Sequence, residues 1–393
     1  MKRAHLAWVA LLAACAACGR SVHRDTSMAP PPVAAAPDTS AAAGAAPQVA
    51  PVAANAPGSP GAAGAPAGPD YAIGTPKTFD NLTIFPVTSK KQDDIGPMTT
   101  LDAALAKGAA FVHETGSGTS GEGAQVNTLV IENKGAVPIY VLAGTIVKGG
   151  KQDRQIGQDF IVGANQTTPV DAFCVEHGRW TTQREGVATG GQFGVVGLLT
   201  PSQVRTAAEH DKDQGEVWAK VAKVNEANKK QAASGTLMAS VDSADVAAKR
   251  AALAKQADNF LASVQPGDDV VGFAYAVDGK VRSVRWFSHH KVFELFRGTL
   301  VGTAAMEAIT TQAEDAAAGK PPAPPPAIAP TAVSSFIHDA QEAKVKEERS
   351  TQGMNVNEIR DSKDAYSSST KYKAPAAAPT AAPRPVSTSV TAF

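Results

Sequence analysis

Two short stretches of the sequence gather residues that could do chemistry, and both follow apolar segments. The first, 149–157, reads GGKQDRQIG, and the second, 174–180, reads CVEHGRW. Consecutive glycines can expose their amides as an anion-binding nest, arginine presents a planar fork to carboxylate or phosphate, and tryptophan offers a flat face to a ring or sugar. These residue types predict a site for a small anionic or glycan-like ligand. The predicted ligand-binding residues are Gly149, Gly150, Lys151, Gln152, Asp153, Arg154, Glu176, Arg179 and Trp180.

Other interpretations of the same residues stay open at this level. The two glycines can form a simple turn followed by solvated charges, and Trp180 can fill a core. Asp153 and Glu176 are the carboxylates that could act as general bases, which would make the protein a hydrolase of a phosphorylated or ribosylated substrate, or they can be ion-pair partners. A third possibility is a structural or interaction module of the envelope. Cys174 alternates with Ala172 along a predicted strand, so a buried structural thiol is favoured over a nucleophile, although His177 is close in sequence.

The remaining motifs do not predict a cofactor or a metal. GSGTSG (116–121) is followed by strand-like sequence where a dinucleotide site needs a helix, so it predicts a hairpin tip. His289 and His290 are neighbours and project in different directions, which does not suit two ligands of one metal ion. The 37 basic and 37 acidic residues give a net charge of zero, without the basic excess of a nucleic-acid-binding surface.

The N-terminus predicts export and a lipid anchor. Two basic residues at positions 2 and 3 precede an apolar run too short to span a bilayer. LAAC (12–15) then resembles the bacterial lipoprotein box, which implies acylation of Cys15; Cys18 is the alternative, and an ordinary cleaved signal peptide stays possible. The membrane is therefore the expected partner. The expected location is the bacterial cell envelope, at the outer membrane facing the periplasm.

The pattern of apolar residues predicts an α+β fold. Residues 109–197 alternate short apolar runs with turn signals, as in a sandwich or barrel-like sheet. Helices are expected at 99–108, 215–231, 242–265, 290–309 and 334–348. VVGFAYAVDGKVRSVRWF (270–287) predicts a β-hairpin, since Asp-Gly favours a type I′ turn, and 355–372 contains polar strand-like sequence.

The site must then be positioned by a strand meander. The two chemical stretches are separated by one apolar strand, DFIVGA, and a turn, so an antiparallel meander can return the chain to the same sheet edge. The two stretches should therefore meet, with Lys151, Arg154 and Arg179 converging on the amides of Gly149 and Gly150.

The expected organisation has one folded domain behind a tether. An Ala/Pro-rich stretch without Phe, Trp or Tyr cannot bury enough apolar surface to order itself. The predicted segments are a signal peptide at 1–17, with cleavage before Cys15 or Cys18; a disordered tether at 18–69; an α+β domain at 70–312; a Pro-rich insert at 313–330; a helix and strand segment packing on the domain at 331–373; and a disordered tail at 374–393.

The segments around the two stretches resemble a known family. LTIFPV, LDAALAKG, ENKGAVPIYVLAGTIVKGGKQDRQI, PVDAFCVEHGRW and QGEVW are similar to the ARG-and-rhodanese-phosphatase-superfamily-associated protein domain. The resemblance covers about 79–309 and extends to 372 at most. The family name implies association with ADP-ribosylglycohydrolases and rhodanese-like phosphatases, without implying an activity or catalytic residues of its own.

Overall fold

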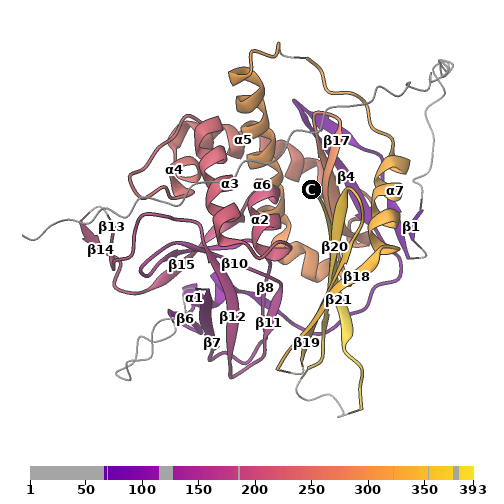
Figure 1. Cartoon of the computed structure of the whole chain (residues 1–393). Coiled ribbons are helices and arrows are strands. Elements are labelled where there is room, and N and C mark those ends of the chain that lie inside the picture. Colours follow the sequence, from indigo (N-terminus) through magenta and orange to yellow (C-terminus); the bar gives the residue numbers. More distant parts are fainter. Residues whose placement is uncertain are drawn as a thin grey trace, which may run out of the picture. The chain divides into compact units, whose positions relative to one another are not determined.

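Antiparallel sheets and a group of helices make up the folded region (Figure 1). The computed structural model describes residues 66–68, 70–114, 127–184, 186–321, 323–352, 354–374 and 380–393, all within the unit Gly61–Phe393. The signal peptide with Cys15 and Cys18, the tether up to residue 65 and the hairpin tip at 116–121 lie outside the described residues.

The largest sheet has ten strands, in the order β1-β2-β4-β16-β17-β21-β20-β19-β18, with β3 added on β4. Its strands are β1 (Pro66–Gly68), β2 (Tyr71–Ile73), β3 (Lys77–Phe79), β4 (Leu82–Thr88), β16 (Val270–Val277), β17 (Lys280–Phe287), β18 (Lys344–Thr351), β19 (Asn355–Asp361), β20 (Ala365–Tyr372) and β21 (Arg384–Ala392). The sheet therefore contains strands from both the N-terminal and the C-terminal parts of the domain.

A six-stranded sheet carries the candidate site, in the order β15-β9-β10-β12-β7-β6. Its strands are β6 (Ala110–Glu114), β7 (Thr128–Asn133), β9 (Thr145–Gly149), β10 (Arg154–Ile156), β12 (Gln166–Cys174) and β15 (Phe193–Leu199). Two small sheets complete the set: β11 (Phe160–Val162), β8 (Ile139–Val141) and β5 (Thr99–Thr100), and the pair β13 (Gln183–Arg184) and β14 (Val187–Ala188).

Helices cover both faces of the large sheet. On one face lies α6 (His290–Ala317), which packs on β16 and β4, while α7 (Pro330–Gln341) packs on β2, β17 and β20 from the other side (Figure 1). The others are α1 (Leu101–Ala106), α2 (Ser202–Glu209), α3 (Gln214–Ala227), α4 (Met238–Val241), α5 (Ala244–Ala262) and the 3-10 turn η1 (Gly267–Asp269). None of the described helices is long and apolar enough to cross a membrane.

Local sequence explains where the predicted helices begin. In α3, Asp213 caps the first turn by accepting from the amides of Gly215 and Glu216, and Val217, Val221 and Val224 are buried on one face. In α1 the hydroxyl of Thr100 accepts from the Ala103 amide. The predictions of these helices and of α5 and α6 are confirmed, as is the α+β class.

The predicted hairpin is confirmed as well. In the connection between β16 and β17, Asp278 has φ 49° and Gly279 has φ 75°, which are the two positive φ angles of a type I′ turn. Both strands lie in the middle of the large sheet, where β16 pairs with β4 and β17 with β21.

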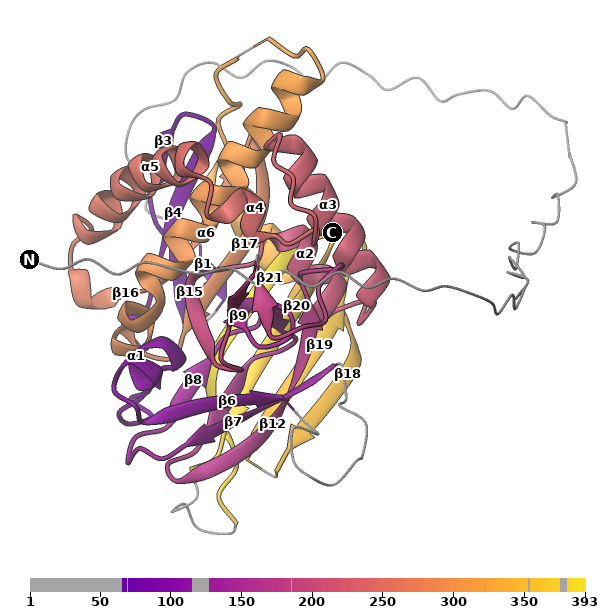
Figure 2. The ribbon, with the colours of Figure 1, turned by 90° about the vertical axis from the view of Figure 1, so that its left-hand side faces the viewer.

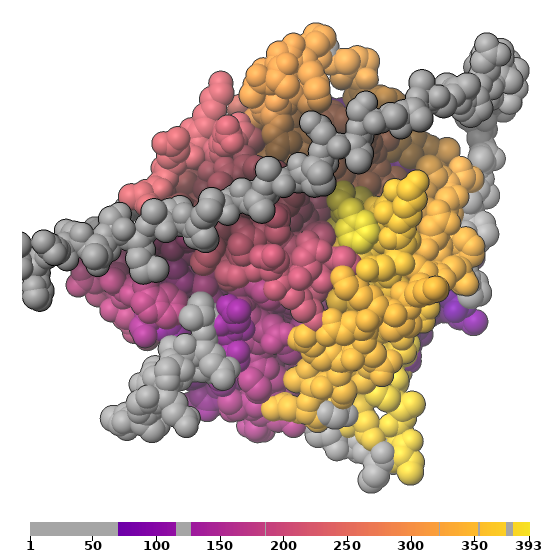
Figure 3. Space-filling view, viewed as in Figure 1, coloured from indigo at the N-terminus to yellow at the C-terminus, as the bar shows by residue number. Residues whose placement is uncertain are grey.

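The C-terminal predictions need correction. Residues 384–392 form β21, which pairs with β17 on one side and β20 on the other, so a disordered tail is wrong for these residues. Figure 3 shows the C-terminal residues (yellow) beside residues coloured rose and gold. The centre of the Phe393 ring lies 4.9 Å from that of His210, the residue that follows α2. Alternating Val, Ser and Thr suit a strand buried between two others, and the flanking Pro and Ala residues obscured that signal.

Three further boundaries differ from the predictions. The helix expected at 334–348 ends at Gln341, and β18 follows as the charged edge strand of the large sheet. The Pro-rich insert expected from 313 begins inside α6. β1 occupies 66–68, within the predicted tether.

A buried ion pair joins the small three-stranded sheet to the large one. Asp159, just before β11, accepts from Arg285 Nη1 at 2.8 Å, the Tyr140 hydroxyl at 2.6 Å and the Ala143 amide at 2.8 Å. Burial alone would raise the pKa of the Asp159 carboxyl, but Arg285 and these hydrogen bonds hold it below its ordinary value. The pair fixes the segment between β10 and β12 against the large sheet.

The six-stranded sheet and the C-terminal strands lie side by side in both ribbon views (Figures 1 and 2). The Thr168 hydroxyl of β12 donates to Gln352 Oε1 at 3.0 Å, and Asp171 forms an ion pair with Arg349 of β18. The strand β18 and the turn after it, within the segment 331–373 that was predicted to pack on the domain, therefore belong to the framework behind the candidate site.

We expect Val390→Ala to lower the free energy of unfolding by about 2 kcal/mol, because Val390 is fully buried in β21 and the change removes methyl groups and leaves a cavity. Urea unfolding of the full chain measures the loss. The same change at Val345, which is 49% exposed on β18, should stay within about 0.5 kcal/mol. Equal small effects at both positions would contradict a buried β21.

Candidate functional site

The two chemical stretches meet at one end of the six-stranded sheet, as predicted. β10 pairs with β12 so that Arg154 lies opposite Cys174, and the Val175 amide continues the pairing by donating to the Asp153 carbonyl at 2.9 Å. The strand between them, β11, pairs with β8 instead of its sequence neighbours. The return to the same edge therefore depends on a strand that leaves the sheet, and not on a simple meander.

Gly149 and Gly150 form a turn that only glycine fits. Their φ angles are 146° and 48°, and a Cβ would overlap the Gln192 carbonyl oxygen at Gly149 and the Phe193 ring at Gly150. Their amides are already bound within the protein: Gly149 donates to Asp153 Oδ1 at 3.0 Å and Gly150 to the Gln192 carbonyl at 3.2 Å. The prediction that these two amides bind an external anion is thus wrong, because Asp153 already occupies the Gly149 amide and the Gln192 carbonyl occupies the Gly150 amide.

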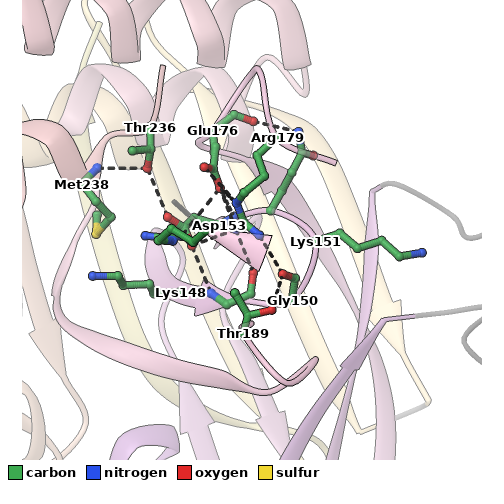
Figure 4. A network of polar contacts seen from close by, with 12 residues as sticks. Lys148, Gly150, Lys151, Asp153, Glu176, Arg179, Thr189, Thr236 and Met238 are labelled. Carbon is green, nitrogen blue, oxygen red and sulfur yellow. Dashed lines mark hydrogen bonds and ion pairs between the residues drawn. The ribbon is translucent and has the colours of Figure 1, made fainter. Parts of the chain in front are cut away.

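Arg179 joins the two stretches through its whole guanidinium (Figure 4). Nε donates to both oxygens of Glu176 at 3.0 Å. Nη1 donates to the carbonyls of Gly150 at 2.8 Å and Thr181 at 2.7 Å, and Nη2 to that of Gly149 at 3.2 Å. Since Arg179 is 7% exposed and engaged on every side, it holds the glycine turn against the Glu176 loop.

The two carboxylates at this junction are also engaged by the protein. Asp153 is fully buried and accepts from Gly149, from the Thr236 hydroxyl at 3.1 Å and from Arg184. Glu176 is 1% exposed and its Oε2 accepts from the Asp153 amide at 3.0 Å. We call Asp153, Glu176 and Arg179 the clasp.

The clasp carboxylates do not have the environment of a general base. Burial raises the pKa of Glu176, but hydrogen bonds from Arg179, Ser234 and the Asp153 amide outweigh it and leave the pKa below its ordinary value. A general base needs an accessible oxygen and a pKa near the working pH. The geometry therefore favours the ion-pair interpretation of Asp153 and Glu176 over the catalytic one.

The predicted convergence of Lys151 and Arg154 with Arg179 is wrong. Lys151 points away from the clasp in Figure 4, and its Nζ and the Arg154 guanidinium each lie 5.6 Å from the centre of the Trp180 ring. Glu114 accepts from the Lys151 amide at 3.1 Å and from Arg154 Nη2 at 3.2 Å. These cations surround the tryptophan instead of the glycine amides.

Cys174 and Gln152 are part of the framework. Cys174 is fully buried, as predicted, and burial raises the pKa of its thiol, which opposes a role as nucleophile. Its backbone pairs with the Gln214 side chain at 2.8 and 2.9 Å, while His177 packs edge-on against Trp218. The side-chain Nε2 of Gln152 donates to the Glu176 carbonyl at 3.0 Å.

A cavity of about 620 Å³ lies beside the clasp. Of the predicted ligand-binding residues, Glu176, Arg179 and Trp180 line it, and the six from Gly149 to Arg154 do not. Its walls also include residues that the sequence did not single out: Lys148, Arg184, Ser234, Thr236, Met238 and Asp242.

The missed residues gave little signal in the sequence. Lys148 directly precedes the glycine pair and Arg184 follows the second stretch after a short turn, so proximity to a predicted site could have flagged both. The segment 231–242 comes from the connection after α3 and carries no pattern of its own. Within the described part of the chain, no group of three His, Cys, Asp or Glu side chains could hold a metal ion.

Glu176→Gln should lower the free energy of unfolding by about 3 kcal/mol at pH 7, because the Arg179 charge loses its buried partner. Urea unfolding measures the change. Glu132→Gln is the matched control: its side chain is 33% exposed and pairs with Lys134 at 3.6 Å, so its effect should stay within about 0.5 kcal/mol.

The contribution of Glu176 to the free energy of unfolding should also depend on pH. Since its pKa is lower in the folded chain than the ordinary value of 4.5, its contribution is fully present above about pH 4.5 and is lost as the pH falls through the lowered pKa. The stability difference between wild type and Glu176→Gln should therefore shrink on acidification from pH 7 to pH 3. A difference that grows on acidification would contradict an ionised clasp.

Comparison with known proteins identifies the family. The family model of the ARG and Rhodanese-Phosphatase-superfamily-associated Protein domain matches residues 70–377. Comparisons with curated proteins and with solved structures gave no match. The family match spans both chemical stretches, the clasp and the cavity, and covers most of the chain, so this protein belongs to the ARG and Rhodanese-Phosphatase-superfamily-associated Protein domain family.

Proposed function

We propose that this chain is a lipid-anchored protein of the bacterial cell envelope whose domain binds a small anionic, glycan-like ligand in the cavity beside the clasp. The observation that carries the proposal is the guanidinium of Arg184 on the cavity wall. Lys148 adds a second cation to the same wall, and the volume of about 620 Å³ is in the range of small-molecule sites.

The guanidinium of Arg184 is held by Asp153 through Nη2, while the residue lines the cavity. Its Nη2 pairs with the buried Asp153 and lies 3.7 Å from Glu176 Oε2. Within the described residues, its Nε and Nη1 make no hydrogen bond, and the side chain is 23% exposed. Burial lowers the pKa of Arg184, but the hydrogen bond to Asp153 outweighs it and raises the pKa. An oriented, permanently charged donor edge is suited to carboxylate or phosphate.

The other walls suit a polyhydroxylated molecule. Trp180 is 44% exposed at the cavity and presents a flat apolar surface. Gln183 and Gln231 are exposed lining residues whose amides both donate and accept hydrogen bonds. A sugar carrying an acidic group has matching features: an apolar ring face, hydroxyls and one negative charge.

The lipid anchor rests on the sequence. The basic start, the short apolar run and LAAC (12–15) support acylation of Cys15 or, alternatively, Cys18. An anchor followed by an Ala/Pro-rich stretch would place the binding domain at a distance from the bilayer. Export makes a soluble envelope molecule, or a fragment of the envelope, a more suitable ligand class than a cytosolic nucleotide.

Arg184→Gln should weaken ligand binding by about tenfold or more, because a hydrogen bond to a charged group contributes about 1.5–3 kcal/mol. The measurement is a thermal-shift screen of the full chain against sugar phosphates, uronic acids and dicarboxylates. A ligand at a hundred times its Kd should stabilise the wild type by about 2.7 kcal/mol.

Arg349→Gln is the control for this screen. Arg349 pairs with Asp171 on another part of the surface and its side chain is 32% exposed, so its loss should leave ligand shifts unchanged. Because Arg184→Gln also removes a partner of the buried Asp153, the ligand shift of each protein is measured from its own unliganded melting temperature. Equal shifts for all three proteins, or no shift with any compound, would reject the cavity as an anion site.

Metabolic labelling with an alkyne fatty acid tests the anchor. We expect the wild type and Cys18→Ala to be labelled, and Cys15→Ala and the double variant to lose the label, because the LAAC box places the acylated thiol at Cys15. Label retained in Cys15→Ala and lost in Cys18→Ala would move the anchor to Cys18. An unlabelled wild type would end the proposal of a lipid anchor.

A further inference from the structure

We propose that the anionic group of the ligand binds between Lys148 and Arg184, and that the carboxylate of Asp242 occupies this subsite in the unliganded protein. The inference rests on the proposed function and adds the position of the charge and the residue that competes for it. Asp242 is then a specificity-determining residue: its carboxylate releases Lys148 when the carboxylate or phosphate of a ligand enters the cavity.

Asp242 reaches the cavity from the far wall. It caps the C-terminus of α4 and its Oδ2 lies 2.5 Å from Nζ of Lys148, the next-to-last residue of β9. Both residues line the cavity together with Arg184. Figure 4 shows Lys148 on the same side of the clasp as Met238, the first residue of α4. The ion pair therefore bridges the two sides of the cavity.

The negative charge of Asp242 also influences two neighbouring arginines. Its charge acts on the guanidinium of Arg184 and on that of Arg250, and Arg250 Nη1 is anchored at 3.0 Å on the carbonyl of Val241. The Asp242 carboxylate bonds to Lys148 and lines the same cavity as Arg184, so it has the surroundings that an anionic ligand group would have. We infer that it stands in for that group.

The two carboxylates that neutralise the cavity cations differ in how firmly they are held. Asp153, the partner of Arg184, is fully buried and also accepts from Gly149 and Thr236. The Asp242 side chain is 49% exposed, and among the described residues its carboxylate bonds to Lys148 alone. An exposed ion pair of this kind contributes little to stability. A ligand anion can therefore displace Asp242, whereas it cannot displace Asp153.

Isothermal titration of the full chain with sodium phosphate, at constant ionic strength, tests the inference. Asp242→Asn should bind phosphate about three- to fivefold more tightly than wild type, which corresponds to the strength of an exposed ion pair. Lys148→Met should weaken binding. The double variant should lose most of the gain, because among the described residues Lys148 is the cation that the Asp242 carboxylate bonds.

Asp315→Asn is the matched control. Asp315 forms a comparable surface pair with Lys320 at 2.5 Å, in a different cavity, and its removal changes the net charge equally. A gain as large in Asp315→Asn as in Asp242→Asn would reduce the effect to net charge and overturn the inference. So would a gain that persists in the double variant with Lys148→Met.

The failure of this inference can be told apart from the failure of the proposed function. If Arg184→Gln weakens phosphate binding while Asp242→Asn leaves it at the wild-type value, the cavity binds anions and Asp242 is not the stand-in. If phosphate binds neither wild type nor Asp242→Asn, the inference that Asp242 stands in for a ligand anion is overturned. The thermal-shift screen with Arg184→Gln still decides the proposed function.

Discussion

The guanidinium of Arg179 is the interaction on which the candidate site depends. It binds the Glu176 carboxylate and the carbonyls of Gly149 and Gly150, which come from the two ends of a long chain excursion. Because the guanidinium is buried, each of these bonds acts in a medium of low dielectric constant, and the loss of one partner leaves an uncompensated charge. The clasp holds the turn in a conformation that glycine alone adopts without strain.

The framework behind the clasp uses the same kind of interaction at a second place. Asp159 and Arg285 pair in the interior and connect the chain before β11 to the central strand β17. Because β11 lies outside the six-stranded sheet, this pair holds the start of β11 in place before the chain returns to the sheet as β12. The clasp across both ends of the excursion and the Asp159–Arg285 pair within it thus determine where β10 and β12 meet.

The cavity differs from the clasp in how its charges are exposed. The charges of the clasp are themselves buried and support structure, whereas Lys148, Arg184 and Asp242 are partly exposed on the cavity wall. A charge that keeps contact with water costs little to re-pair, so the same residue types serve different purposes in adjacent places. The proposed ligand binds the partly exposed charges of the cavity and not the buried charges of the clasp.

The sequence by itself determined the local features of this protein: the α+β class, the capped helices and the Asp-Gly hairpin, since each follows from short-range periodicity and turn chemistry. It also predicted that the two stretches meet, although the path between them is not the simple meander expected. It also led to the family. Only the tertiary structure decided that Arg179 binds glycine carbonyls, that Lys151 and Arg154 turn to Trp180, and that residues 384–392 form an interior strand. These outcomes depend on partners far apart in the chain, such as Arg179 for Gly149 and β17 for β21. A long-range pairing leaves no periodic pattern, because its free energy comes from burial and charge neutralisation that exist only after the chain has folded.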